Sequence, residues 1–175
     1  MPYCSAILAI GEHPAQEARG WGCIWWGIIV SVAGVDLVDE TFIVVQPQVL
    51  AGVVADPASW VRWWPDLRLT VFMDRGVNGQ RWSMTGALVG SLEIWIEPFA
   101  DGCIVHHYLR GEPSDDGLTP APWPDTPKGW RAAAKERARR ATAWKRTVWE
   151  LKREVEQQRP AGAAPAWATS HEEGQ

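Results

Sequence analysis

The side chains best suited to acid–base chemistry, or to binding an acidic group, are two histidines, a tyrosine and an arginine. His106, His107 and Tyr108 are consecutive in the β-rich segment Cys103–Arg110, and Arg137 lies in an alanine-rich segment further on. On a strand His106 and His107 point to opposite faces, so they cannot share a metal ion. A single His or Tyr inside a cavity can still transfer a proton. We therefore take His106, Tyr108 and Arg137 as candidate site residues, with a structural role as the alternative for each.

No recognised catalytic or metal-binding signature accompanies these residues. Glu93 and Glu97 share a strand face but lie roughly 13 Å apart, too far for two carboxylates that act together. The sequence has no Gly-rich phosphate loop, nucleophile elbow or H-E-x-x-H motif. Cys4, Cys23 and Cys103 lack C-x-x-C spacing, which argues against a disulfide framework or a zinc site. We expect no cofactor and no metal, assign no catalytic residue, and predict a cytoplasmic location.

The length of 175 residues is that of one domain with appendages, and it is enough for a hydrophobic core. The net charge of −4 hides an asymmetry. Ten of the 17 lysines and arginines but only four of the 21 acidic residues lie between residues 128 and 157, so this stretch carries +6 and the remainder −10. A basic helix can bind nucleic acid or an anionic membrane, or it can be a solvated face balanced by the protein's own acidic surface. We favour the balanced face and predict no nucleic-acid partner.

One long helix is predicted over residues 126–158. Thr126 can cap its first backbone N–H groups, Pro127 suits the first helical position, and Pro160 marks the stop. At 1.5 Å per residue the helix is roughly 45 Å long, so other elements must wrap around it. One face recurs at three- and four-residue steps: Trp130, Ala133, Ala134, Arg137, Ala141, Trp144, Val148, Leu151 and Val155.

This predicted face changes character along the helix. Its C-terminal half carries bulky residues such as Trp144, whereas its N-terminal half carries Ala133, Ala134 and Ala141 with Arg137 and Arg140 among them. Protein interiors are closely packed, so the space that these alanines leave must be filled. Either bulky residues of a facing sheet fill it, or it is a cavity with an arginine near its mouth.

The part of the chain before this helix has the pattern of a β-sheet with two short helices. Short helices are expected from Pro47 and Pro57, and turn signals typical of an antiparallel meander separate most of the strands. The predicted strands are Leu37–Val45, Leu67–Asp74, Gln80–Ala87, Gly90–Glu97 and Cys103–Arg110. Gly111–Pro127 holds five prolines in 17 residues, and we expect it to arch across the cavity entrance as a lid.

The face of the sheet that lines the cavity decides the chemistry there. In Gly90–Glu97 the aliphatic residues Leu92, Ile94 and Ile96 alternate with a mixed set that contains Trp95. If the aliphatic set faces the helix, the cavity is apolar and Trp95 lies on the outer surface of the sheet. If the mixed set faces the helix, the pocket is polar and aromatic. We favour the first arrangement, because burying a glutamate without a partner is costly.

Residues 1–35 look unlike the rest of the chain. Sixteen uncharged residues separate Arg19 from Asp36. A membrane-spanning helix needs ~20, so we expect no stable membrane insertion. We interpret this segment as an N-terminal extension, with a misassigned start as the explanation that we favour. The folded domain is predicted at residues 36–158, followed by a disordered tail at residues 159–175.

The order of elements and three segments resemble the START-like (SRPBCC) superfamily, and within it the actinobacterial polyketide cyclase/dehydrase and lipid-transport type proteins. The segments are A-D-P-A-x-W-x-x-W-W-P at Ala55–Pro65, G-A-L-V-G-S-L-E-I-W-I-E-P at Gly86–Pro98, and the long helix. The resemblance covers residues 36–158 and implies an α+β helix-grip fold. In that fold a curved antiparallel sheet wraps around the C-terminal helix, two short helices follow the first strand, and a cavity lies between sheet and helix. We expect five or six strands rather than the usual seven, and therefore a small or partly open cavity.

From this resemblance we predict that the protein binds or carries a small hydrophobic or amphipathic ligand in that cavity. Two alternatives stay open. One is an enzyme of the cyclase or dehydratase kind that uses a cavity His or Tyr as acid and base, and the other is an interaction module that uses the basic helix. The oligomeric state is left undetermined. The candidate ligand-binding residues are Trp60, Trp64, Trp82, Trp95, His106, Tyr108, Ala134, Arg137 and Ala141.

Overall fold

The fold is taken from a computed structural model of the chain, which describes residues 34–157, 159, 163 and 164. The predicted N-terminal extension at residues 1–35 and the predicted tail at residues 159–175 lie almost entirely outside the described residues. All described residues belong to one of the two units into which the chain divides.

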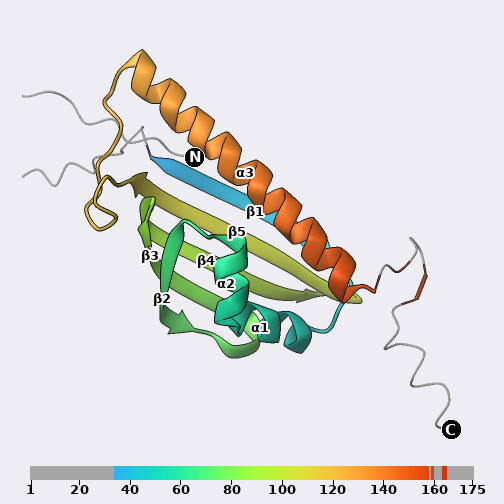
Figure 1. Ribbon diagram of the computed structural model, residues 1–175. Coiled ribbons are helices and arrows are strands. Elements are labelled where there is room, and N and C mark those ends of the chain that lie inside the picture. Colours follow the sequence, from blue (N-terminus) through green and yellow to red (C-terminus); the bar gives the residue numbers. More distant parts are fainter. Residues whose placement is uncertain (1–33, 158, 160–162, 165–175) are drawn as a thin grey trace, which may run out of the picture. The chain divides into compact units, whose positions relative to one another are not determined.

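Five antiparallel strands form a sheet with the order β1-β5-β4-β3-β2. The elements are β1 (Val35–Ile43), α1 (Pro47–Ala55), α2 (Pro57–Trp63), β2 (Leu67–Asp74), the short 3-10 turn η1 (Gly76–Asn78), β3 (Gly79–Gly86), β4 (Leu88–Phe99), β5 (Gly102–Pro113) and α3 (Pro127–Val155). Figure 1 shows α3 running beside β1, with α1 and α2 nearer the other edge of the sheet. This arrangement confirms the α+β helix-grip fold expected from the START-like resemblance, with five strands in the described part of the chain.

Side-chain caps and prolines begin two of the helices where the sequence predicts. Asp56 Oδ1 accepts a hydrogen bond from Ala58 N at 2.9 Å at the start of α2. Thr126 Oγ1 accepts one from Gly129 N at 3.2 Å at the start of α3. Each cap satisfies a backbone donor that has no partner within its own helix. Local chemistry therefore sets these helix starts without help from the rest of the fold.

The inner face of the sheet is the aliphatic one, as predicted. Leu92, Ile94 and Ile96 of β4 are buried against the helices, whereas Trp95 between them belongs to the outer face and is only half-buried. The arrangement follows from the period of two along a strand, which places every second side chain on the same face. The alternative with Trp95 inside is thereby excluded.

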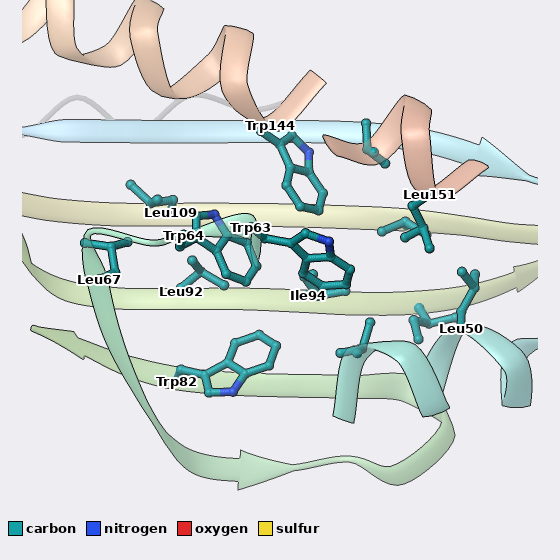
Figure 2. Packing of buried hydrophobic residues seen from close by; sticks show 14 of the residues in the cluster. Leu50, Trp63, Trp64, Leu67, Trp82, Leu92, Ile94, Leu109, Trp144 and Leu151 are labelled. Atoms are coloured by element: carbon teal, nitrogen blue, oxygen red, sulfur yellow. The ribbon is translucent and has the colours of Figure 1, made fainter. Parts of the chain in front are cut away.

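Tryptophan rings fill much of the space between the sheet and the helices (Figure 2). Trp63 and Trp64, at the end of α2, meet Trp144 from α3 in one cluster, and Trp64 also meets Trp82 from β3. The ring centroids of these pairs are 5.5–6.3 Å apart. Aromatic pairs at such separations add ~0.5–1.5 kcal/mol to the stability from burial itself. Bulky residues of neighbouring elements thus occupy much of the space between the sheet and the helices.

The buried face of α3 is rotated from the predicted one in its N-terminal half. Its C-terminal half is buried at Trp144, Val148 and Leu151, as predicted. Further upstream Ala133 is buried as predicted, but the other buried residues, Gly129 and Arg140, were not on the predicted face. Alanine suits a buried or an exposed position almost equally well, so the spacing of alanines did not fix which side of this half faces the sheet.

Candidate functional site

A pocket of about 280 Å³ lies between the α2–β2 connection, the inner face of the sheet at β1 and β5, and the middle of α3. We call it the α3 pocket. Its lining residues are Arg62, Trp63, Trp64, Pro65 and Asp66 before β2, Leu37, His107 and Leu109 on the sheet, and Arg139, Arg140, Ala143, Trp144, Arg146 and Thr147 on α3. Small-molecule sites usually measure ~300–1,000 Å³, so this pocket lies at the small end of the range.

Three nearly parallel rings form the aromatic wall of the α3 pocket. The imidazole of His107 stacks on Trp144 with the ring centroids 4.0 Å apart and an interplanar angle of 15°. Trp64 stacks on Trp144 at 5.7 Å and 9°. Trp144 is held in position by its indole Nε1, which donates to Asp39 Oδ2 at 3.1 Å. The rings cover much of one another's faces, and the aromatic surface that they leave toward the pocket suits a small ligand with a planar, apolar ring.

His107 contributes the polar edge of this wall. The side chain is 1% exposed, and neither ring nitrogen has a hydrogen-bond partner among the described residues. Burial lowers the pKa of the imidazole to about 3, although the nearby Asp39 carboxylate acts in the opposite direction. The ring is thus neutral at physiological pH, with one N–H donor and one acceptor nitrogen. Leaving such a buried group unpaired costs roughly 1–3 kcal/mol, and a ligand that pairs with it would recover that free energy.

An ion-pair network borders the α3 pocket on one side. Arg140 is 5% exposed and donates to both carboxylate oxygens of Asp66, at 3.0 and 2.7 Å, and to Glu136 at 2.9 Å. Arg139 pairs with the same two carboxylates. The hydrogen bonds from Arg139 first, and then from Arg140, lower the pKa of Glu136 to about 2. The network ties α3 to the α2–β2 connection and holds that side of the pocket in place.

Arg140→Met should destabilise the protein by roughly 1–3 kcal/mol, because Asp66 and Glu136 lose their buried partner. Both carboxylates keep some contact with solvent, so the loss is smaller than for a fully buried pair. Arg137→Met removes the same charge from an exposed position of α3 and should change the free energy of unfolding by less than ~0.5 kcal/mol. Urea unfolding followed by circular dichroism measures both. Equal losses would show that Arg140 is not the buried arginine of α3.

Of the predicted ligand-binding tryptophans before β4, one lines the α3 pocket. Trp64 forms part of its aromatic wall. Trp60 and Trp82 lie in the adjoining core, where their rings meet edge to face with the centroids 5.5 Å apart. Trp60 also donates from Nε1 to the carbonyl oxygen of Val54 at 2.7 Å. These two tryptophans therefore serve the packing of α1 and α2 on the sheet.

Three predicted residues of α3 do not reach the pocket. Ala134 and Arg137 are exposed, and Ala141 is half-buried but outside the pocket lining. Of the two arginines that the sequence places among these alanines, Arg140 lines the pocket and Arg137, the predicted site residue, does not. The physical reason is the ion pairing with Asp66, because a guanidinium that is paired with two carboxylates can be buried at a modest cost.

Three further predicted residues, Trp95, His106 and Tyr108, belong to the outer face of the sheet and do not line the cavity in which they were expected. His106 is buried there by stacking on Trp95, with the ring centroids 4.3 Å apart. Its Nδ1 lies 3.1 Å from a carboxylate oxygen of Glu40, and its Nε2 lies 2.9 Å from one of Glu97. These contacts join β5 to both neighbouring strands, which is a structural role.

The proline-rich segment Gly111–Pro127 is not a lid over the α3 pocket, contrary to the prediction. β5 continues to Pro113, and the segment then lies against the turn between β3 and β4, where Gly86 N donates to Gly117 O at 2.8 Å. None of its residues lines the pocket. Backbone hydrogen bonds to that turn satisfy polar groups of the segment and keep it at the end of the sheet.

His107 and Asp66 line the pocket but were not predicted as site residues. For His107 the sequence did contain an indication, the alternation of residues along its strand. In Cys103–Arg110 the aliphatic residues Val105 and Leu109 are expected inside, and His107 shares their face. Asp66 gave no such signal, because its role depends on an arginine 74 positions away in the chain.

Three other features could indicate a function: a reactive thiol, a metal site and a membrane-spanning helix. Cys103 is a buried free thiol on the inner face, and burial raises its pKa, which makes it a poor nucleophile. No three His, Cys, Asp or Glu side chains of the described residues are placed to hold a metal ion together. None of the helices described here has both the length and the hydrophobicity to cross a bilayer.

Comparison with known proteins concerns the fold alone. No family model matches the chain, and no curated protein matches it in sequence. Among solved structures, the Aha1 dimer from Colwellia psychrerythraea is similar at 12% identity, over 70% of this chain and 96% of that chain, with a TM-score of 0.44. A START superfamily protein from Mycobacterium smegmatis is similar at 14% identity, over 71% and 99%, with a TM-score of 0.37. The Zhui aromatase/cyclase from a Streptomyces species is similar at 14% identity, over 75% and 99%, with a TM-score of 0.37.

Proposed function

We propose that the α3 pocket binds a small, planar, amphipathic molecule. The observation that carries the proposal is a buried imidazole without a partner beside an aromatic wall, formed by His107 next to the stacked rings of Trp64 and Trp144. A molecule of this class stacks on the wall and forms hydrogen bonds with His107. The volume of about 280 Å³ restricts it to the small end of the ligand range.

Stacking and hydrogen bonding contribute differently to such binding. Burial of the flat apolar body provides most of the affinity, at ~25 cal/mol per Å² of apolar surface removed from water. The hydrogen bond to His107 provides selectivity, because a ligand without a matching polar group leaves the buried ring nitrogens unpaired. A ring that carries an N–H group or a carbonyl oxygen is therefore preferred over a plain hydrocarbon.

The cyclase- or dehydratase-type alternative receives weaker support from the same histidine. A general base is most effective when its pKa lies near the working pH, and the pKa of His107 is lowered to about 3. With this pKa, His107 is a hydrogen-bonding group rather than an effective proton acceptor at neutral pH. Turnover that is lost in His107→Phe while substrate binding is retained would favour the enzyme instead.

The interaction-module alternative is weakened by ion pairs within the chain. Several basic residues of α3 already have acidic partners. The pairs are Arg139 and Arg140 with Asp66 and Glu136, Lys145 with Asp39, and Lys152 with Glu156. This part of the positive charge is balanced by the protein's own carboxylates, which leaves less of it for nucleic acid or an anionic membrane.

Filling the α3 pocket tests the proposal. N-phenylnaphthylamine is a neutral probe with a planar naphthyl ring and one N–H group, and its fluorescence should rise when it binds to the protein. Ala143 is half-buried and lines the pocket. Ala143→Trp should weaken binding of the probe by at least about tenfold, because the indole occupies the same space. The control Ala134→Trp adds the same ring at an exposed position and should leave binding unchanged.

Thermal unfolding followed by circular dichroism establishes that both variants are folded. Unchanged affinity in a folded Ala143→Trp protein would show that the probe binds elsewhere. Absence of probe binding to the wild type would contradict the proposal directly.

A further inference from the structure

The charged residues that line the α3 pocket are predominantly basic. Four arginines line it, whereas Asp66 is the one acidic residue in the lining. The arginines are Arg62, Arg139, Arg140 and Arg146. The ion pairs that each arginine forms within the protein decide how much of this positive charge a ligand can meet.

Two of these arginines are neutralised within the protein. Arg139 and Arg140 pair with Asp66 and Glu136 at distances of 2.6–3.1 Å. The two positive and two negative charges of this network cancel. An anionic ligand would have to compete with two well-placed carboxylates for these guanidinium groups.

Arg62 and Arg146 have a different environment. Arg62 lies in the last turn of α2 and Arg146 on α3, so they border the pocket from different walls. Both are exposed, and neither forms an ion pair with any described residue. The C-terminal end of α2 favours a cation and accounts for part of the placement of Arg62. No helix end accounts for Arg146, which lies in the interior of α3.

We infer that the ligand of the α3 pocket carries an acidic group, which Arg62 and Arg146 bind at the mouth while the aromatic wall holds the ring. This inference rests on the proposed function and adds the charge of the ligand to it. A guanidinium keeps its charge at physiological pH and binds a carboxylate through two parallel hydrogen bonds. Neutral His107, in the interior, pairs with an uncharged polar group of the ring. The ligand class is therefore a small, planar aromatic acid.

Two molecules that differ in charge but hardly in shape test this inference. Naphthoate and naphthamide, substituted at the same ring position, can each displace N-phenylnaphthylamine from the pocket. We expect naphthoate to bind more tightly than naphthamide. The ratio of the two dissociation constants should change by about tenfold, toward equality, in the double variant Arg62→Gln/Arg146→Gln. Both side chains are exposed, so this variant should melt near the wild-type temperature.

The double variant Arg131→Gln/Arg137→Gln is the matched control, because it removes the same net charge from exposed positions outside the pocket lining. An unchanged ratio in Arg62→Gln/Arg146→Gln, while naphthamide still displaces the probe, overturns the inference and leaves the proposed function standing. A ratio that changes equally in both double variants reveals general electrostatic attraction and overturns it as well. If the probe itself does not bind to the wild type, the proposed function fails together with the inference.

Discussion

Trp144→Ala should lower the free energy of unfolding by roughly 3–5 kcal/mol. The side chain is 4% exposed and packs against Trp63, Trp64 and His107. Its truncation opens a cavity between α3 and the sheet and removes the hydrogen bond to Asp39. Small domains have a total stability of only ~5–15 kcal/mol, so a loss of this size is a large fraction of the total.

Trp149 provides the matched control on the same helix. It is 52% exposed and lies about 140° from Trp144 around the helix axis. Trp149→Ala should therefore cost less than ~0.5 kcal/mol. Urea unfolding followed by far-ultraviolet circular dichroism compares the two variants without relying on tryptophan fluorescence. Similar losses in both would mean that α3 turns a different face toward the sheet.

His107→Phe should make the protein more resistant to acid. The pKa of His107 is about 3 in the folded protein against an ordinary value of 6.5. Between these two pH values the unfolded chain binds a proton that the folded protein does not bind. The wild type therefore loses stability as the pH falls below 6.5, at ~1.4 kcal/mol per pH unit for this one group. Phenylalanine keeps a ring against Trp144 and cannot be protonated.

Between pH 7 and pH 4, the free energy of unfolding should fall by about 3 kcal/mol less in His107→Phe than in the wild type. Glu136, with its pKa lowered to about 2, also reduces stability below pH 4.5, but it does so equally in both proteins. Tyr108→Phe on the outer face is the control, with the pH dependence of the wild type. Parallel pH curves for His107→Phe and the wild type would mean that the folded protein protonates His107 as readily as the unfolded chain does.

The two ring nitrogens of His107, which have no hydrogen-bond partner among the described residues, lower the free energy of unfolding. At neutral pH His107→Phe should leave the protein at least as stable as the wild type, because it removes two buried nitrogens without partners. Other buried polar atoms without partners, such as Trp82 Nε1 and Gln80 Oε1, lie outside the lining of the α3 pocket, whereas both ring nitrogens of His107 belong to a residue that lines it. The same residue thus supports the assignment of the α3 pocket as a binding site.

The sequence by itself determined the type and order of the elements. The cap at Thr126 and the proline at the start of each helix act within a few residues of the chain, so they can be identified without knowing the fold. The alternation of Leu92, Ile94 and Ile96 identified the inner face of β4 in the same way. The bulky half of α3 followed as well, since Trp144 and its apolar neighbours can be buried in only one orientation of the helix.

Only the tertiary structure decided which residues meet in the α3 pocket. The N-terminal half of α3 is turned so that Arg140 reaches Asp66, 74 positions away in the chain, and leaves Arg137 in solvent. Alanines carry too small a difference in hydrophobicity between their two sides to determine that rotation. His107 could be placed on the inner face by alternation, but its lowered pKa and unpaired nitrogens arise from rings that packing brings around it. Desolvation and ion pairing depend on neighbours in space, so no pattern along the chain contains them.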